Sequence, residues 1–132
     1  MPSTWIEEAI LKRLLADSSV TAIVSRRIYY MQSPQNVEFP YIVFYIAVDS
    51  DERVIVGNDG SSPLFTFDIF GKPGDLVDLK TVDKAVRTSL MDYTGALDGI
   101  TVIMIYREGA RDLIEDDGII RLSRDYKVEY LR

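Results

Sequence analysis

The residues with the greatest potential for chemistry are carboxylates that cluster between positions 112 and 117. The cluster contains Asp112, Glu115, Asp116 and Asp117. Carboxylate oxygens bind hard cations, but a calcium loop carries them at alternate positions and has a glycine at its sixth position. The spacing in this cluster differs from that pattern. We therefore predict a solvated hairpin tip rather than a cation site, and the same interpretation applies to Asp49, Asp51 and Glu52.

Two residue types that dominate enzyme chemistry are missing, because the sequence has no histidine and no cysteine. Their absence removes the most common general base, the Ser-His-Asp arrangement, thiolate nucleophiles and sulfur-ligated zinc. The glycines at 71–74 lack the spacing and the Lys-Ser/Thr ending of a phosphate loop. No pair of carboxylates stands out as the acid and base of a glycosidase. We therefore expect a protein that is not an enzyme, with no catalytic residue, no metal and no cofactor.

The bulk composition predicts one folded domain that spans residues 1–132. Its 47% hydrophobic and 27% charged residues are typical of a globular protein. The net charge is −6 and the basic residues are scattered, whereas a nucleic-acid-binding protein normally has a clustered basic face. The longest apolar run is about half of the ~20 residues that span a membrane, and the first residues do not resemble a signal peptide. We expect synthesis in the cytoplasm, no membrane partner and no specific binding of nucleic acid.

Apolar residues spaced three or four positions apart predict two main helices. The first stripe consists of Ile6, Ile10 and Leu14, widened by Leu11 and Leu15. A capping box of Thr4 and Glu7 precedes this stripe, and a short helical turn at 20–24 follows it. The second helix is capped by Asp75 and carries Leu76, Leu79, Val82, Val86 and Leu90. The charged residues off this stripe, among them Lys80 and Asp83, are expected to form a solvated face.

Alternating polarity and the frequency of β-branched and aromatic residues predict the strands. Strands are expected at 27–30, 39–48, 53–56, 64–70, 100–106 and 119–130, turns or loops at 49–52, 57–62 and 93–99, and a polar connection at 107–118. In the last strand, Arg124 interrupts an otherwise apolar face. Short turns favour antiparallel pairing. The predicted fold class is α+β, with a single, mainly antiparallel β-sheet and two main helices packed on one face.

The strand at 39–48 is apolar on both of its faces. One face carries Ile42, Phe44 and Ile46, and the other carries Tyr41, Val43 and Tyr45. We assign the first set to the core and the second to the less covered face, although the two assignments could be exchanged. Two helices of three to four turns do not cover both faces of a sheet, so the surplus apolar surface predicts a subunit interface. A strongly curled sheet that buries both faces within one chain is the alternative.

Five segments follow one another in an order and spacing that are similar to those of a known family. They are the helical segment at 6–24, the Arg27-Ile28-Tyr29 strand, Pro34 with Phe39-Pro40-Tyr41-Ile42-Val43-Phe44, the strand at 65–70 followed by a helix, and the strand at 125–130. In this order the chain resembles, nearly end to end, the tail completion (tail terminator) proteins of long-tailed bacteriophages and prophages. That family has no catalytic motif, so the resemblance implies a role rather than an active site.

The resemblance implies a small α+β subunit that forms a hexameric ring, in some cases only on its template. Such a ring caps the tail tube, stops its polymerisation and presents a surface to the head connector. The implied partners are therefore other copies of the chain, the tail tube protein and the head connector protein. The implied location is the virion tail, after synthesis in the bacterial host cytoplasm, and DNA can pass through the ring.

We place the predicted subunit interface at Tyr41, Val43 and Tyr45, together with Gln35 and Asn36 in the preceding loop. A heterologous ring needs a second, different patch, for which the turns after Val48 and Val56 are candidates. Three alternatives to this role stay open. The first is a head-closure or minor tail component. The second is an acidic protein-binding module unrelated to phages, which would form a monomer or dimer without a ring. The third is a small histidine-free enzyme, which would have a deep polar pocket with converging carboxylates.

Overall fold

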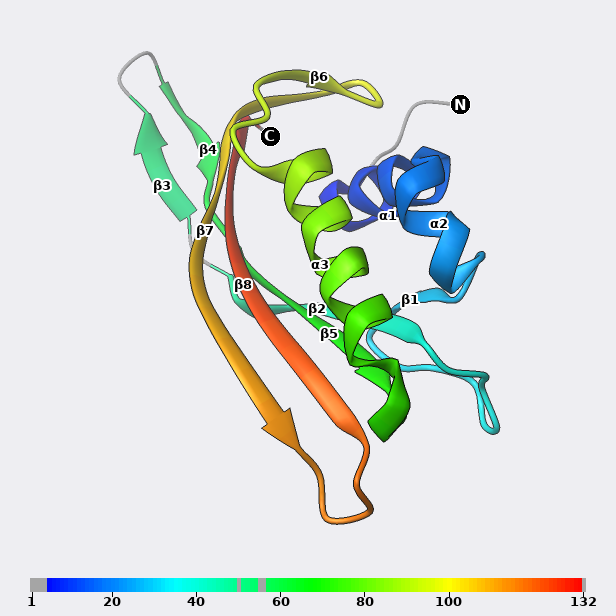
Figure 1. Ribbon diagram of the computed structural model, residues 1–132. Helices are drawn as coiled ribbons and strands as arrows, with labels where there is room; N and C mark the ends of the chain where they lie inside the picture. The colour runs from blue at the N-terminus through cyan, green and yellow to red at the C-terminus, as the bar shows by residue number, and fades with distance from the viewer. Residues whose placement is uncertain (1–4, 50, 55–56, 132) are drawn as a thin grey trace.

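The computed structural model describes residues 5–49, 51–54 and 57–131. It contains helices and one mainly antiparallel sheet, so the predicted α+β class is confirmed. Figure 1 shows the long, curled strands of the sheet with the helices lying next to one another beside them. No helix among the described residues has the length and apolarity that crossing a membrane requires.

Three helices form in the described chain, α1 (Ile6–Ala16), α2 (Ser18–Val24) and α3 (Leu76–Leu90). Asp17 separates the first two, and its Oδ1 accepts a hydrogen bond of 2.9 Å from the backbone N–H of Ser19, which caps α2. A 3₁₀ turn at Pro73–Asp75 precedes α3. The sequence predicts that Asp75 caps α3, but its side chain makes no capping hydrogen bond there. The Asp75 carboxylate accepts the N–H of Lys72 instead. Thr4, half of the predicted capping box, lies outside the described residues.

Eight strands among the described residues belong to one sheet. They are β1 (Ile28–Tyr30), β2 (Tyr41–Val48), β3 (Asp51–Val54), β4 (Gly57–Ser61), β5 (Leu64–Gly71), β6 (Gly95–Leu97), β7 (Ile100–Ile114) and β8 (Ile120–Leu131). The order along the sheet is β1-β2-β5-β8-β4-β3, and β7 pairs with both β6 and β8. All described pairs are antiparallel except β1 with β2, which are parallel and are joined by the loop at 31–40.

Four predictions about the strands were wrong. The turn expected at 49–52 is strand from Asp51, where β3 begins. The segment 57–62 was expected to be a turn, but most of it forms β4, which pairs with β3 and with the end of β8. The expected loop at 93–99 contains β6. The polar connection expected at 107–118 is strand as far as residue 114, because β7 pairs with β8 along almost its whole length. The end of the predicted strand at 53–56 lies outside the described residues.

The core is formed by alternate residues of the central strands and by the apolar stripes of the helices. Ile42, Ile69 and Leu122 lie side by side on β2, β5 and β8, and all three are buried. Phe44 stacks on Phe67 with ring centroids 5.1 Å apart. The prediction that Ile42 and Phe44 belong to the core is therefore confirmed.

Gly71, at the end of β5, allows α3 to approach the sheet. A Cβ atom at this position would lie 2.7 Å from both Cδ atoms of Leu79, which is fully buried. We expect Gly71→Ala to lower the free energy of unfolding by about 1–3 kcal/mol, since the core has no room for the methyl group. Urea denaturation measures this loss. Gly74→Ala is the matched control, because a Cβ there meets no atom within 4 Å; equal losses in the two variants would contradict the packing argument.

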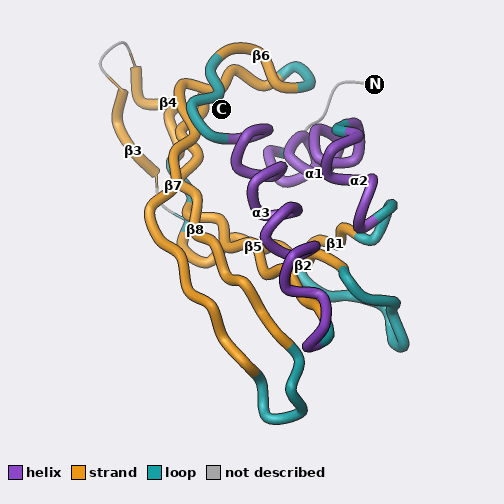
Figure 2. The backbone as a smooth tube through the Cα atoms, viewed as in Figure 1, coloured by secondary structure: helices purple, strands orange, loops and turns teal. Residues whose placement is uncertain are grey.

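One end of the sheet carries a turn and a loop, and the other end carries the short strands β3 and β4. Figure 2 shows the turn between β7 and β8 and the loop between β1 and β2 toward the lower end of the view. At the opposite end, β4 pairs with β8 through Gly60 and Ser61, and β3 continues the sheet beyond it. The turn at Glu115–Gly118 has the composition expected of a turn, and the N–H of Gly118 donates to the carbonyl of Glu115 at 2.9 Å.

Candidate assembly surface

The second set of alternate residues on the central strands forms what we call the outer face. Strand register places its residues in three rows, Tyr41–Phe70–Arg121, Val43–Asp68–Ser123 and Tyr45–Thr66–Asp125. These residues point away from the side chains of Ile42 and Phe44, because successive residues of a strand alternate between faces. The outer face is therefore aromatic and apolar on β2 and increasingly charged toward β8.

The aromatic end of the outer face is a stack of rings. Tyr41 stacks on Phe70 with centroids 4.9 Å apart and an interplanar angle of 19°. Phe39 lies on the other side, 5.3 Å from Tyr41. Burial raises the pKa of Tyr41 above its ordinary value, and a side-chain hydrogen bond with Ser33 opposes that shift. The rings thus hold the loop before β2 against the start of the strand.

The charged end of the outer face is a hydrogen-bonded network across β5, β7 and β8. Thr66 donates to Asp125 Oδ1 at 2.8 Å, and Arg111 Nη1 donates to Asp125 Oδ2 at 2.8 Å. Arg111 Nη2 also donates to Ser123 Oγ at 3.0 Å. Gly109 lies opposite Asp125, and a Cβ there would approach Asp125 Oδ2 to 3.2 Å. The arginine therefore lies flat across the sheet and covers part of it.

The network predicts acid sensitivity. The hydrogen bond from Arg111 is the main reason why the pKa of Asp125 is lower than its ordinary value of 3.8. A carboxyl group whose pKa is lower in the folded state stabilises the fold at pH above 3.8, and this contribution is lost as the pH falls from 3.8 through the folded value. Denaturation midpoints measured from pH 6 to pH 3 should fall less steeply in Asp125→Asn than in the parent protein. Parallel pH profiles would contradict this assignment.

The centre of the outer face is closed within a single chain. Val43 is only 9% exposed and Asp68 only 4%, whereas Tyr41 and Tyr45 are half-buried. Asp68 Oδ2 lies 3.9 Å from Arg121 Nη1, and Asp68 Oδ1 has no hydrogen-bond partner among the described residues. The curl of the sheet and its long side chains therefore bury part of the surface that we assigned to a subunit contact.

The predicted interface residues fall into two groups. Tyr41, Val43 and Tyr45 lie on the same face of β2, as their alternation implies. Gln35 and Asn36 are exposed in the separate loop between β1 and β2. Asn36 has φ of 57°, a left-handed conformation that asparagine adopts more readily than most residues. Among the predicted interface residues, a neighbouring molecule can thus reach the two tyrosines and the two loop residues but not Val43.

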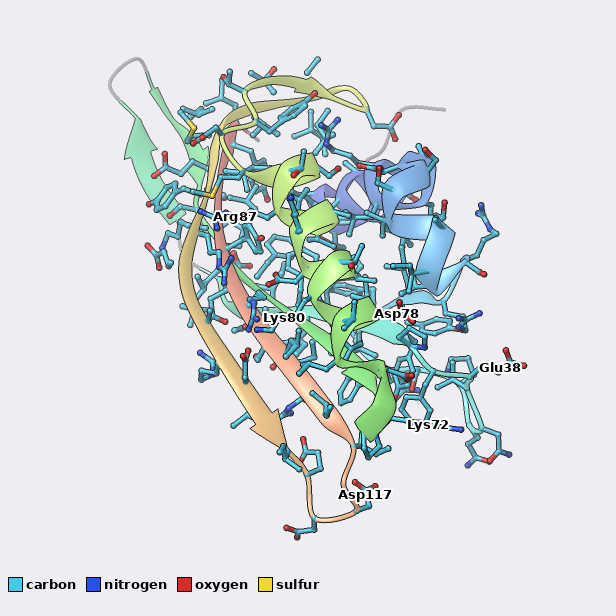
Figure 3. All side chains as sticks on the ribbon, in the orientation of Figure 1. Glu38, Lys72, Asp78, Lys80, Arg87 and Asp117 are labelled. Atoms are coloured by element: carbon cyan, nitrogen blue, oxygen red, sulfur yellow. The ribbon has the colours of Figure 1, made fainter. Side chains whose placement is uncertain are left out.

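On the core side of β8, Arg124 is 3% exposed and joins the sheet to α3. Its Nη1 lies 2.8 Å from Asp112 Oδ1 and donates to the carbonyl of Arg111 at 3.0 Å. Its Nε lies 3.1 Å from Asp83 Oδ2, within ion-pair distance although not aligned as a hydrogen bond. Lys80 of α3, labelled in Figure 3, donates to Asp112 at 3.0 Å.

The sequence reasoning missed this ion-pair cluster. Lys80 is exposed, as we expected, but it pairs with Asp112, which lies on β7 and not in a hairpin tip. Asp83, which we also expected to be solvated, is half-buried beside Arg124. The signal was present in the sequence. Arg124 occupies a core position of a strand, and a buried arginine requires carboxylates that neutralise it.

The described residues hold no group of three or more carboxylates close enough to bind a metal ion. Asp116 and Asp117 are exposed in the turn between β7 and β8. The charged residues brought together by the fold are ion pairs that join strands and helix, and the accessible remainder includes apolar as well as aromatic and polar residues. Such an arrangement suits binding to another protein.

Comparison with known proteins gives one family and a number of similar solved structures. The profile of the family described as tail completion protein gp17 matches residues 8–129. A chain in the virion of a native gene transfer agent particle is 16% identical and superposes with a TM-score of 0.83, over 96% of this chain and 95% of that chain. A second solved structure, whose description names no function, is 16% identical with a TM-score of 0.54, over 93% and 92%. No curated protein sequence gives a significant match.

Proposed function

Because the chain belongs to the tail completion protein gp17 family, we propose that it caps the phage tail tube, stops tail polymerisation and helps to join the tail to the head. The family assignment over residues 8–129 is the observation that carries this proposal. Members of the family are structural virion proteins, which agrees with the non-enzymatic role expected from the absence of histidine and cysteine.

In this proposal the chain is a single tail-terminator-like domain, residues 1–132, and six copies form a ring. The helices cover one face of the sheet, and the outer face supplies one of the two patches that a heterologous ring requires. Tyr41 and Tyr45 are half-buried aromatic residues at its accessible edge, with Gln35 and Asn36 beside them on the preceding loop. Large aromatic side chains at the edge of a surface favour protein contacts.

The ring meets the tail tube protein on one side and the head connector protein on the other, and the tail tube serves as the template for its assembly. Its location is the virion tail, after synthesis in the cytoplasm of the bacterial host. The acidic net charge of −6 suits a passage through which DNA moves without adhering, since like charges repel.

Deletion of the gene tests this function. We expect tails of uncontrolled length in electron micrographs of the mutant phage, and tails of normal length after complementation. Tails of normal length that fail to join heads would instead indicate a head-closure protein and contradict tail termination. Normal particles would contradict both roles.

A further inference from the structure

A shallow groove lies at the end of the sheet that carries the turn between β7 and β8. Its volume is about 460 Å³. Its walls are the rings of Phe39, Tyr41 and Phe70, the side chain of Ile119, and the carboxylates of Asp116 and Asp117, with Glu115 at the margin. These residues come from the loop before β2, the first residues of β2, the last residues of β5 and the turn between β7 and β8.

Two of the carboxylates in the groove, those of Asp116 and Asp117, have no cationic partner among the described residues. Glu115 is paired with Arg121 at 3.0 Å. Asp116 and Asp117 form no ion pair with any described residue, and the one hydrogen bond of Asp117 is that of its Oδ1, which accepts the N–H of Ile119 at 3.1 Å. Stacked aromatic faces and unpaired carboxylates in one groove match the chemistry of an arginine side chain, because a guanidinium stacks on rings and pairs with carboxylates.

The groove already shows a preference for cations. Lys72 Nζ lies 5.9 Å from the centroid of the Phe39 ring. Lys72 is exposed and precedes α3, and Figure 3 shows it at the same end of the molecule as Asp117. The ammonium group of Lys72 therefore lies at the outer margin of the aromatic surface, where a guanidinium from another molecule can compete with it.

We propose that this groove receives an arginine from a basic segment of a different protein. A second copy is the poorer occupant, because its net charge of −6 does not complement the carboxylates of the groove. The groove lies at the strand ends and shares Tyr41 and Phe70 with the outer face. A basic segment of a different protein supplies the positive charge that Asp116 and Asp117 lack.

Titration with a capped triarginine peptide, followed through the aromatic ring signals in NMR spectra, tests this inference on the full chain. We expect saturable shifts of the Phe39, Tyr41 and Phe70 signals, weaker shifts with trilysine and none with triglutamate. Asp116→Asn combined with Asp117→Asn should weaken triarginine binding about fivefold, the effect of two exposed ion pairs. Asparagine at 117 retains an Oδ1 acceptor for the N–H of Ile119, so the turn is preserved.

Two further variants sharpen the test. Lys72→Ala removes the competing ammonium group and should tighten triarginine binding roughly twofold to fivefold. Asp49→Asn combined with Asp92→Asn changes the net charge equally, at exposed residues outside the groove, and should leave binding nearly unchanged.

Three results would overturn the inference. The first is the absence of saturable shifts with triarginine. The second is equal weakening of triarginine binding in the two double variants. The third is that self-association of the protein alone already shifts the groove's ring signals and blocks any further shift by triarginine. The last result would assign the groove to a second copy while supporting a ring, so the inference and the proposed function can fail separately.

Discussion

Replacing Arg124 with alanine is expected to lower the free energy of unfolding by about 3–5 kcal/mol, the usual cost of removing one partner from a buried ion pair. Arg124 is 3% exposed, and its removal leaves the carboxylate of Asp83, whose side chain is 13% exposed, without its cation. It also removes the hydrogen bond to the carbonyl of Arg111 that ties β8 to β7. Urea denaturation of the purified variant measures the loss.

Two variants serve as controls for Arg124→Ala. Arg26→Ala removes an exposed arginine and should change the free energy of unfolding by less than about 0.5 kcal/mol. Arg124→Leu combined with Asp83→Leu should recover much of the stability, because replacing both members of a buried pair with apolar residues is often neutral. A loss in Arg124→Ala no larger than that in Arg26→Ala would show that the cluster does not hold α3 on the sheet.

Replacing Tyr45 with lysine is expected to abolish assembly on tail tubes while the subunit stays folded. Burial of a lysine in the proposed contact, together with loss of the aromatic ring, should cost at least about 2 kcal/mol at each subunit contact, the size of an interface hot spot. The same change is tolerable in the single chain, since Tyr45 is half-buried and the carboxylates of Asp68 and Asp125 lie near it on the outer face. Sedimentation with purified tail tubes measures assembly.

Thr101→Lys is the matched control for Tyr45→Lys. It introduces the same charge at an exposed position near the start of β7, which pairs there with β6 and not with β2 or β5, and should assemble normally. Thermal unfolding of both variants verifies that each remains folded. Normal assembly of a folded Tyr45→Lys variant would remove Tyr45 from the subunit contact and would leave the interface to be sought at the loop or at the opposite end of the sheet.

The sequence alone correctly predicted the elements that depend on the local pattern of apolar residues. The stripe of Ile6, Ile10 and Leu14 predicted α1, and the alternation of β2 correctly separated Phe44 from Tyr45. The strands that escaped prediction are those made by pairing rather than by propensity. β4 contains two glycines and no β-branched residue, and it becomes a strand because β3 and β8 flank it.

The second half of β7, residues 107–114, was not predicted as strand for a related reason. Residues 107–114 are largely charged, so their pattern indicated a solvated connection, but β8 supplies a partner at almost every position. The ion-pair cluster depends on the same topology. No local pattern places Asp83 of α3 and Asp112 of β7 on either side of Arg124, since the three residues meet only when α3 lies on the sheet.

The shared face of the proposed interface residues follows from the sequence, and the structure shows how far each of them is exposed. Alternation placed Tyr41, Val43 and Tyr45 together, as the register shows. It did not reveal that Arg111 and Arg121 lie over the sheet, or that Val43 is nearly buried in the single chain. The curled sheet therefore accounts for the burial of Val43 within one chain, and the subunit contact is proposed only for the half-buried edge at Tyr41 and Tyr45.

The most direct test of the central claim is electron cryomicroscopy of purified tail tubes mixed with the purified protein. The account predicts a closed ring of six copies at one end of each tube, with the outer face of each subunit against its neighbour, and tubes that no longer elongate when tube protein is added. Tubes that remain bare, or that bind single copies along their length and continue to grow, would contradict it.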